Sequence, residues 1–216
     1  MSLYSKFKNI AQLLKKKRYK VLFSKFGSFI FNWERFFILN IGIDELKIEK
    51  REIEGLTTRI TGSSDIPGLN EMLGDLEYNL EKLGPENTCM AAEINGSFVG
   101  MQWNKIADSH YEHRNRYNIF IGANNAWMFY AFVHHEYRQR GIWRRLHFEM
   151  VQYLRSRAVK KIYCLVYKNK PTVIKAHTDL GYKVEREVLH IRFMILNVFF
   201  KKVPDGKSGV SFRISL

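Results

Sequence analysis

Apolar residues recur along this chain at two spacings, one typical of helices and the other typical of strands. At the start of the chain, Leu3, Phe7, Ile10 and Leu14 fall at steps of three and four residues, which places them on one face of a helix. Elsewhere the apolar residues form short runs, as they do in strands. These runs are Phe36–Ile43, Leu46–Ile53, Leu56–Thr61, Cys89–Ile94, Phe98–Ile106, Trp127–Val133, Lys161–Tyr167 and Tyr182–Phe200.

Capping and turn residues mark the other helices and one hairpin. Residues 63–65 (Ser-Ser-Asp) can cap a helix that has Pro67 in its first turn, and a second helical stretch reaches about Leu83, where Gly-Pro follows. Asn95-Gly96 is a two-residue hairpin turn, and the polar residues 108–118 predict a loop. Two later helices are predicted at Trp143–Arg157 and Pro171–Leu180, the second closed by Gly181.

The order of these elements predicts the fold class. From Leu56 it is one strand, two helices, three strands, and then helix, strand, helix and strand. Strands and helices mix without regular β-α-β alternation, so we predict an α+β fold with a mixed sheet. We divide the chain into a basic helix and strand extension (1–50), a main domain (51–200) and a polar C-terminal tail (201–216).

Composition and charge limit the classes of partner. The chain has 216 residues, is 46% hydrophobic, and carries a formal charge of +14. From Met1 to Asn32 there are eight Lys or Arg residues and no acidic residue. This segment predicts a helix docked on the domain with a solvated basic face, or alternatively a contact with an anionic membrane surface. We expect no nucleic acid partner.

Candidate metal, thiol and membrane features are weak. His110, Glu112 and His113 lie close together, but their spacing is unspecific and no fourth ligand is evident, so no metal is expected. Cys89 and Cys164 lie inside apolar runs, which predicts buried, reduced thiols. No signal peptide and no spanning apolar segment are evident. We therefore expect a cytoplasmic protein, with the inner face of the membrane as an open alternative.

The stretch between the strand ending at Val133 and the helix at Trp143 carries the clearest chemistry. A strand that turns directly into a helix leaves several backbone N–H groups free at the helix start, where the helix dipole adds positive charge. Gly141 lets the backbone approach a bulky anion closely. A group of arginines adds attraction. From the residues alone, this is a phosphate site at a helix N-terminus.

This stretch resembles the CoA-binding motif of GNAT acetyltransferases, whose pattern is Q/R-x-x-G-x-G/A after the fourth strand. Arg138 and Gly141 fit the pattern, whereas Trp143 stands where the family usually has Gly or Ala. A second match is Asn169 at a strand end, followed by a helix that stops at Gly181-Tyr182. The hairpin around residues 95–96 resembles the family's second and third strands. The similarity covers about Leu56 to Ile195.

The resemblance implies a fold, a cofactor and a set of binding residues. The fold is that of the GNAT acyltransferases, in which the fourth and fifth strands splay apart and the pantetheine arm of acetyl-CoA, or another acyl-CoA, lies between them. The residues implied to bind the cofactor are Phe132, Val133, Arg138, Gln139, Arg140, Gly141, Ile142, Trp143 and Asn169.

The resemblance also implies a reaction, the direct attack of an amine on the acyl-CoA thioester. Many members use a Tyr, four residues before the Gly of Gly-Phe, to protonate the CoA thiolate; here that position is His177. Tyr167 and Tyr182 are alternatives for this acid. His134 and Glu136 are candidates for the base, which water can replace.

We therefore expect an N-acyltransferase whose acceptor is a small-molecule or envelope-precursor amine. The alternative is a non-catalytic module that binds CoA or a polyanion, because both Trp143 and His177 depart from the family pattern.

Overall fold

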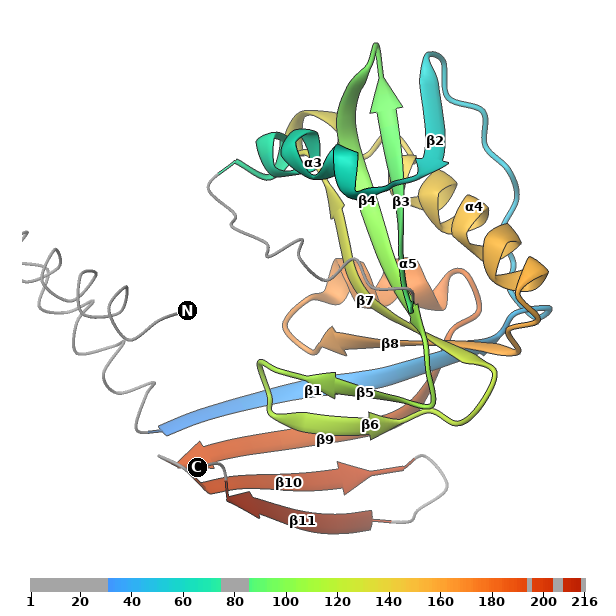
Figure 1. Cartoon of the computed structure of the whole chain (residues 1–216). Coiled ribbons are helices and arrows are strands. Elements are labelled where there is room, and N and C mark those ends of the chain that lie inside the picture. Colours follow the sequence, from blue (N-terminus) through green and yellow to red (C-terminus); the bar gives the residue numbers. More distant parts are fainter. Residues whose placement is uncertain (1–30, 75–85, 194–195, 204–207, 215–216) are drawn as a thin grey trace, which may run out of the picture. The chain divides into compact units, whose positions relative to one another are not determined.

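The structure is a computed structural model that describes residues 31–74, 86–193, 196–203 and 208–214 (Figure 1). The predicted first helix, its basic run, and the helical stretch predicted to reach Leu83 lie outside the described residues. Contacts divide the described chain into two compact units, one within Phe37–Glu185 and the other formed by the described residues on either side of it. The predicted domain boundaries at residues 50 and 200 stay predictions.

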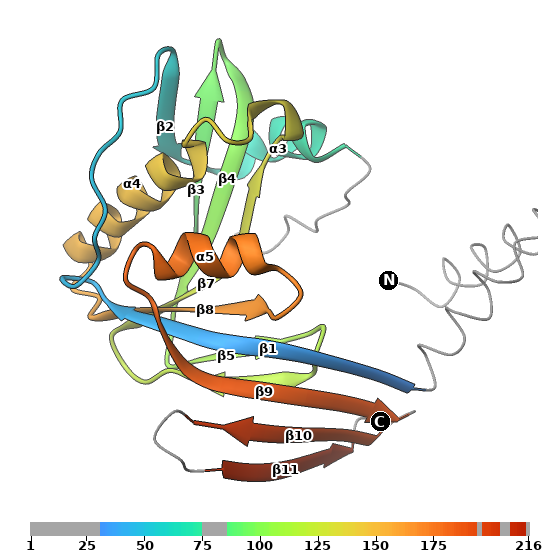
Figure 2. The same ribbon diagram turned by 180° about the vertical axis from the view of Figure 1, so that it is seen from behind.

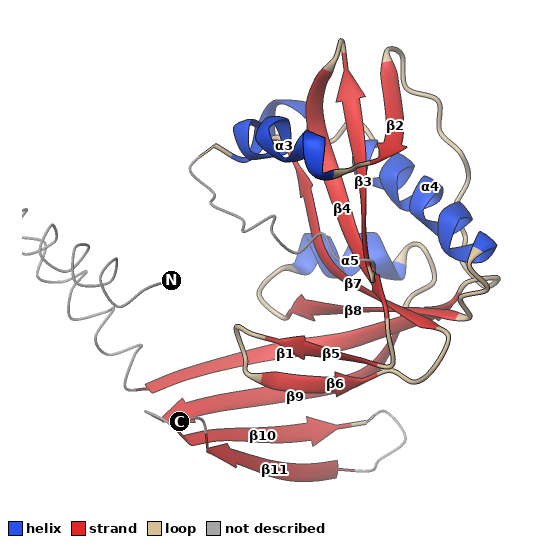
Figure 3. Ribbon diagram, in the orientation of Figure 1, coloured by secondary structure: helices blue, strands red, loops and turns tan. Residues whose placement is uncertain are grey.

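Strands dominate the described chain, and Figure 3 separates them from the helices by colour. The strands are β1 (Phe31–Gly42), β2 (Leu56–Ile60), β3 (Asn87–Ile94), β4 (Ser97–Ile106), β5 (Ser109–Glu112), β6 (Tyr117–Phe120), β7 (Asn125–Val133), β8 (Lys161–Tyr167), β9 (Lys183–Phe193), β10 (Leu196–Lys202) and β11 (Ser208–Ile214). The α-helices are α3 (Ile66–Leu73), α4 (Ile142–Ser156) and α5 (Pro171–Thr178), and short 3-10 turns are η1 (Ser63–Asp65) and η3 (His135–Tyr137).

Within Phe37–Glu185, the strands follow the order β1-β8-β7-β4-β3-β2. β2, β3, β4 and β7 pair antiparallel, whereas β7 and β8 pair parallel. The sheet is therefore mixed, and the predicted α+β class is confirmed. In the other unit, β10 pairs antiparallel with both β9 and β11.

The hairpin between β3 and β4 forms where the sequence predicts it. Asn95 has φ 52° and Gly96 has φ 77°, so both central residues of the turn are left-handed. Such a turn matches the twist of the two flanking strands, and Asn-Gly is the pair that adopts it most readily. The predicted helix start is also present, because Pro67 lies in the first turn of α3.

Side chains of β4 divide the core between the two faces of the sheet. Met101 and Trp103 pack with residues of α3. Gln102, one residue between them, instead contacts His147 of α4. Alternation along a strand explains this division. One face is thus covered by α3 and the other by α4, as Figures 1 and 2 show from opposite sides.

Three local predictions were wrong. Residues 46–53 form no strand. Individual apolar side chains of this segment pack on the core, and its backbone makes isolated hydrogen bonds instead of pairing along a strand, such as Lys47 N to Leu180 O at 3.1 Å. Residues 108–118 are not a simple loop but carry β5 and the start of β6, which pair antiparallel. The polar tail contains β11, which pairs along β10; backbone pairing needs no apolar pattern.

Candidate functional site

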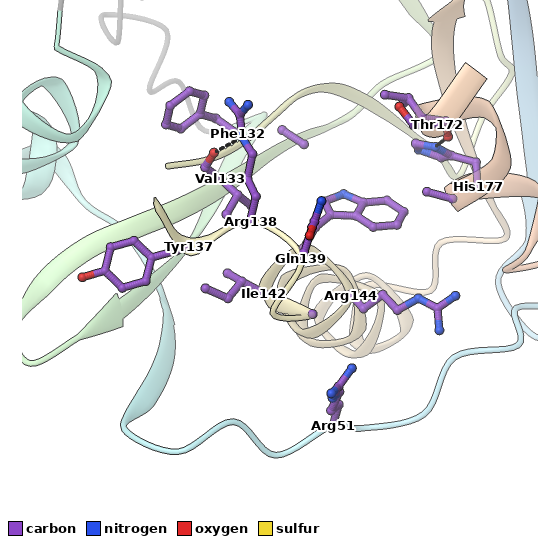
Figure 4. Close-up of a pocket in the computed structure, with 15 residues that line it drawn as sticks. Arg51, Phe132, Val133, Tyr137, Arg138, Gln139, Ile142, Arg144, Thr172 and His177 are labelled. Atoms are coloured by element: carbon purple, nitrogen blue, oxygen red, sulfur yellow. Dashed lines mark hydrogen bonds between the residues drawn. The ribbon is translucent and has the colours of Figure 1, made fainter. Parts of the chain in front are cut away.

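A cavity of about 630 Å³ opens at the first turn of α4 (Figure 4). Its walls come from the end of β7, the turn before α4, α5, and the segment between β1 and β2. The lining residues are Arg51, Ala131, Phe132, Val133, Tyr137, Arg138, Gln139, Gly141, Ile142, Trp143, Arg144, Thr172, Val173, Ala176 and His177. Three of these are arginines and none is acidic, so the described walls favour an anion.

The backbone before α4 has an unusual conformation. Gln139 has φ 63° and Gly141, the N-cap residue, has φ 84°. A non-glycine residue rarely adopts positive φ, and such residues concentrate at functional sites. α4 is 15 residues long, and the N–H groups of its first turn have no partner within the helix. Backbone donors and the helix dipole therefore point toward the cavity.

The arginines near this turn differ in their contacts. Arg138 donates a hydrogen bond from Nε to the carbonyl oxygen of Val133 at 3.1 Å, which leaves its terminal nitrogens for a ligand. Arg144 is exposed on the first turn of α4. Arg140 does not line the cavity; its guanidinium lies 5.2 Å from the ring centre of Tyr137.

Trp143 forms the wall between α4 and α5. Its indole stacks on the ring of His147, with centroids 5.3 Å apart and planes at 15°, and lies 5.0 Å from the ring of His177. The large side chain is thus packed against neighbouring rings. It narrows the cavity at the position where the sequence pattern has a small residue.

His177 is the buried titratable group of this cavity. The residue is 4% exposed, and its Nδ1 lies 2.8 Å from the carbonyl oxygen of Val173. Because a carbonyl only accepts, Nδ1 carries the proton and donates it, which leaves the lone pair on Nε2. Nε2 has no hydrogen-bond partner among the described residues. Burial lowers the pKa of His177, partly offset by the bond to Val173, so the ring is neutral near pH 7.

Behind His177 lies a buried polar network. His147 Nε2 is 3.2 Å from the hydroxyl of Tyr182, and His147 Nδ1 is 3.2 Å from Nε2 of Gln102. Burial, with a contribution from His177, lowers the pKa of His147 to about 3. Burial likewise raises the pKa of Tyr182 well above its usual value. Both groups are neutral at ordinary pH, and Tyr182 does not line the cavity.

Three other predicted site residues do not line this cavity. The hydroxyl of Tyr167 donates to Oδ1 of Asn115 at 2.7 Å, and its ring lines a second cavity of about 360 Å³ beside β5. His134 Nδ1 is 3.8 Å from Glu136, and its ring is 4.3 Å from that of His135. Asn169 is exposed in the turn after β8.

One residue of the site, Arg51, has no signal in the sequence pattern. Arg51 lies between β1 and β2, in a segment without a motif, yet its side chain reaches the first turn of α4 (Figure 4). Only the folded chain brings it there.

The strands beside the cavity separate at the site. β7 and β8 pair from Asn125 and Lys161 to Met128 and Cys164, whereas β7 continues to Val133 and β8 to Tyr167. Residues 131–133 of β7 line the first cavity, and residues 127–130 line the second.

The cysteines and the candidate metal ligands lie outside the chemistry of this cavity, since none of them lines it. Cys89 and Cys164 are buried and form no disulfide. In the described ranges, no group of three or more His, Cys, Asp or Glu residues is arranged to hold a metal ion. None of the described helices has the length and apolar character needed to cross a bilayer.

A mixed sheet whose central parallel strands diverge beside a helix start with unpaired backbone N–H groups defines the GNAT fold, the fold of the GCN5-related N-acetyltransferases. Comparison with known protein families leads to the same assignment. Residues 59–182 match the sequence profile of the Acetyltransferase (GNAT) family. Since this match spans more than half of the chain, the protein belongs to that family.

Solved structures support the same fold at low sequence identity. A GCN5-related N-acetyltransferase from Sphaerobacter thermophilus is 18% identical with a TM-score of 0.57; the match covers 74% of this chain and 52% of that one. One from Kribbella flavida is 13% identical with a TM-score of 0.54, covering 74% and 59%. The chain thus spans little more than half of each. No curated protein sequence matches the chain.

Proposed function

We propose that the protein is an N-acyltransferase that moves an acyl group from acetyl-CoA, or another acyl-CoA, to an amine. The observation that carries this proposal is the first turn of α4, where left-handed Gln139 and Gly141 precede free N–H groups in a cavity lined by three arginines and no acid. Membership of the GNAT family supports acyl transfer in general terms.

The described residues fit a phosphate-bearing ligand. The N–H groups of the first turn and Arg138 would hold the CoA pyrophosphate, and residues 131–133 of β7 would flank the pantetheine arm. Arg140 and Asn169 do not line the cavity, and their part in CoA binding stays a prediction from the sequence. Acyl-CoA supplies the activated thioester carbonyl.

The hydrogen bond of His177 changes its proposed role. In the reaction, the amine nitrogen forms a bond to the acyl carbon, the carbon–sulfur bond breaks, and one proton must move from nitrogen to the sulfur of CoA. A neutral ring with its proton on Nδ1 cannot begin as an acid at Nε2. We propose that Nε2 first accepts the proton of the amine and then donates it to the CoA thiolate. Protonation of the thiolate, the step predicted from the sequence, is then the second of two proton transfers.

The other catalytic candidates have weaker support. Tyr167 is bonded to Asn115 beside the second cavity, and His134 lines neither cavity. Both remain candidates only if the His177 variants described below keep full activity.

For the acceptor we propose a class of compound, a small-molecule or envelope-precursor amine. The experiment is to measure CoA release from acetyl-CoA with a panel of primary amines. We expect at least one amine to raise the rate well above that of hydrolysis.

Trp143 favours the alternative, a non-catalytic module, because it narrows the cavity. If CoA binds in calorimetry but no amine accelerates its release, the alternative replaces the enzyme.

A further inference from the structure

The segment between β1 and β2, residues 43–55, passes beside α4 and is called the strap here (Figure 2). It contains no helix or strand, yet it is fixed at several points. Ile43 N bonds the carbonyl oxygen of Lys160 at 2.9 Å, and Leu46 is buried in the core. The strap therefore has a defined path although it has no regular structure.

Arg145 of α4 holds the strap beside the cavity. This arginine is 9% exposed. Its Nη1 donates to the carbonyl oxygen of Arg51 at 3.2 Å and to Oε2 of Glu52 at 2.9 Å, and its Nη2 lies 2.9 Å from Oε1 of Glu149. A buried guanidinium with these acceptors fixes the backbone at Arg51.

The Arg51 side chain lies against the first turn of α4. A Cβ placed on Gly141 would be 3.2 Å from Nη1 of Arg51 and 3.3 Å from its Cδ. Glu52, the neighbouring carboxylate, already pairs with Arg145 and with Lys50. Among the described residues the guanidinium of Arg51 has no hydrogen-bond or ion-pair partner, so its donors remain for a ligand.

Two further features of this place suit a ligand. The cavity has a volume of about 630 Å³, within the range of ligand pockets. His177 lines it with an Nε2 that is buried and without a partner. Arg51 and the first turn of α4 would then face the same bound anion from two sides.

We propose that Arg51 binds the pyrophosphate of the ligand held at the first turn of α4, and that Arg145 positions it through the strap. This inference rests on the proposed function, because it takes CoA as the ligand. It adds a phosphate-binding arginine from outside the strand–turn–helix motif. A guanidinium can form two parallel hydrogen bonds with phosphate oxygens, which a lysine cannot.

The test is calorimetric binding of CoA, dephospho-CoA and pantetheine to three proteins: wild type, Arg51→Gln and Lys47→Gln. Lys47 is an exposed residue of the same strap that does not line the cavity, so its variant loses the same charge elsewhere. We expect Arg51→Gln to lose at least tenfold in affinity for CoA and for dephospho-CoA alike, since both carry the pyrophosphate. Lys47→Gln should stay within twofold, and pantetheine should bind both variants as it binds wild type.

The possible results distinguish a failure of the inference from a failure of the proposed function. If wild type binds dephospho-CoA and Arg51→Gln binds it within twofold, the inference is wrong and the proposed function stands. If the loss appears for CoA only, Arg51 contacts the 3′-phosphate and the pyrophosphate assignment is overturned. If wild type binds none of the three compounds, the proposed function fails together with the inference.

A second measurement tests the positioning role of Arg145. If Arg145 acts through Arg51, Glu52→Gln, which weakens the hold of Arg145 on the strap, should lower CoA affinity in wild type but not in the Arg51→Gln background. Glu52 is exposed, so this variant should fold. Equal losses in the two backgrounds would show that the strap acts independently of Arg51 and would overturn the positioning role.

Discussion

His177 shows how one hydrogen bond assigns the chemistry of a side chain. The sequence places it where related proteins carry a tyrosine, which suggests an acid. The bond from Nδ1 to the Val173 carbonyl instead leaves the lone pair on Nε2, and burial keeps the ring neutral. At the residue scale, the position of a residue in a motif therefore does not determine its protonation state.

The first prediction concerns turnover. His177→Ala should lower kcat at least tenfold and change CoA affinity little, because the lost interaction belongs to the transition state. His177→Tyr should recover part of the rate. In wild type, kcat should fall on acidification with a midpoint below the usual histidine value of 6.5, since protonation removes the lone pair. An alanine variant within twofold of wild type would rule the role out, and Tyr167 would be tested next.

The second prediction concerns the turn itself. Gly141→Asp introduces a carboxylate beside the phosphates, adds a side chain at φ 84°, and displaces Arg51. CoA affinity should fall at least tenfold, about 1.4 kcal/mol, in calorimetry. Gly122→Asp is the control, because Gly122 has φ 80° but does not line the cavity. Unchanged affinity in a folded Gly141→Asp protein would exclude this turn as the CoA site.

At the scale of elements, the contacts that α4 makes with distant segments build the site, and the presence of each element by itself does not. α4 supplies a free first turn to the cavity, Arg145 to the strap, and His147 to a buried polar network with β4 and Tyr182. A single amphipathic helix thus connects the site with the core. Its pattern was predictable, whereas the partners of its polar residues were not, because they come from distant segments.

The third prediction follows from the burial of His147. Its folded pKa is about 3 and its unfolded pKa is near 6.5, so the unfolded chain binds more protons between these values. The free energy of unfolding should therefore fall as pH falls through this window, by about 2 kcal/mol between pH 7 and pH 5 from this group. Urea unfolding should show a smaller pH dependence in His147→Gln than in wild type.

The matched control is His113→Gln, which changes an exposed histidine. It should retain the wild-type pH dependence. If His147→Gln retains it as well, His147 is not the source of the acid sensitivity.

At the scale of the whole molecule, the described residues that line the proposed site belong to the unit Phe37–Glu185. Most of the basic segment from Met1 to Asn32 lies outside the described residues, so its role stays a prediction from the sequence. Its eight basic residues and lack of acidic ones keep an anionic surface as the proposed partner.

The fourth prediction separates these two roles. Deleting residues 1–32 should leave CoA affinity within twofold of wild type and abolish co-sedimentation with vesicles that contain anionic lipid. The wild-type binding should weaken as salt rises, because exposed charges are screened. A truncated protein that fails to fold would instead identify the segment as part of the domain.

The sequence alone determined most of the elements, because periodicity, capping and turn residues act locally, and the resemblance of residues 138–143 and 169–182 to family motifs indicated the family. The Asn95-Gly96 turn and the β7–α4 junction are examples. Local signals failed for β11, for β5 and β6, and for the strap, where pairing or packing with distant residues decides the backbone.

Tertiary structure alone decided which side chains share the site. Arg51 reaches the first turn of α4 because Arg145 anchors a segment that is about ninety residues away in sequence. The same fold separated Tyr167 from His177, since they line different cavities. Local sequence encodes φ and ψ preferences and helix faces, but a contact between distant segments depends on the packing of the whole core, which no short pattern contains.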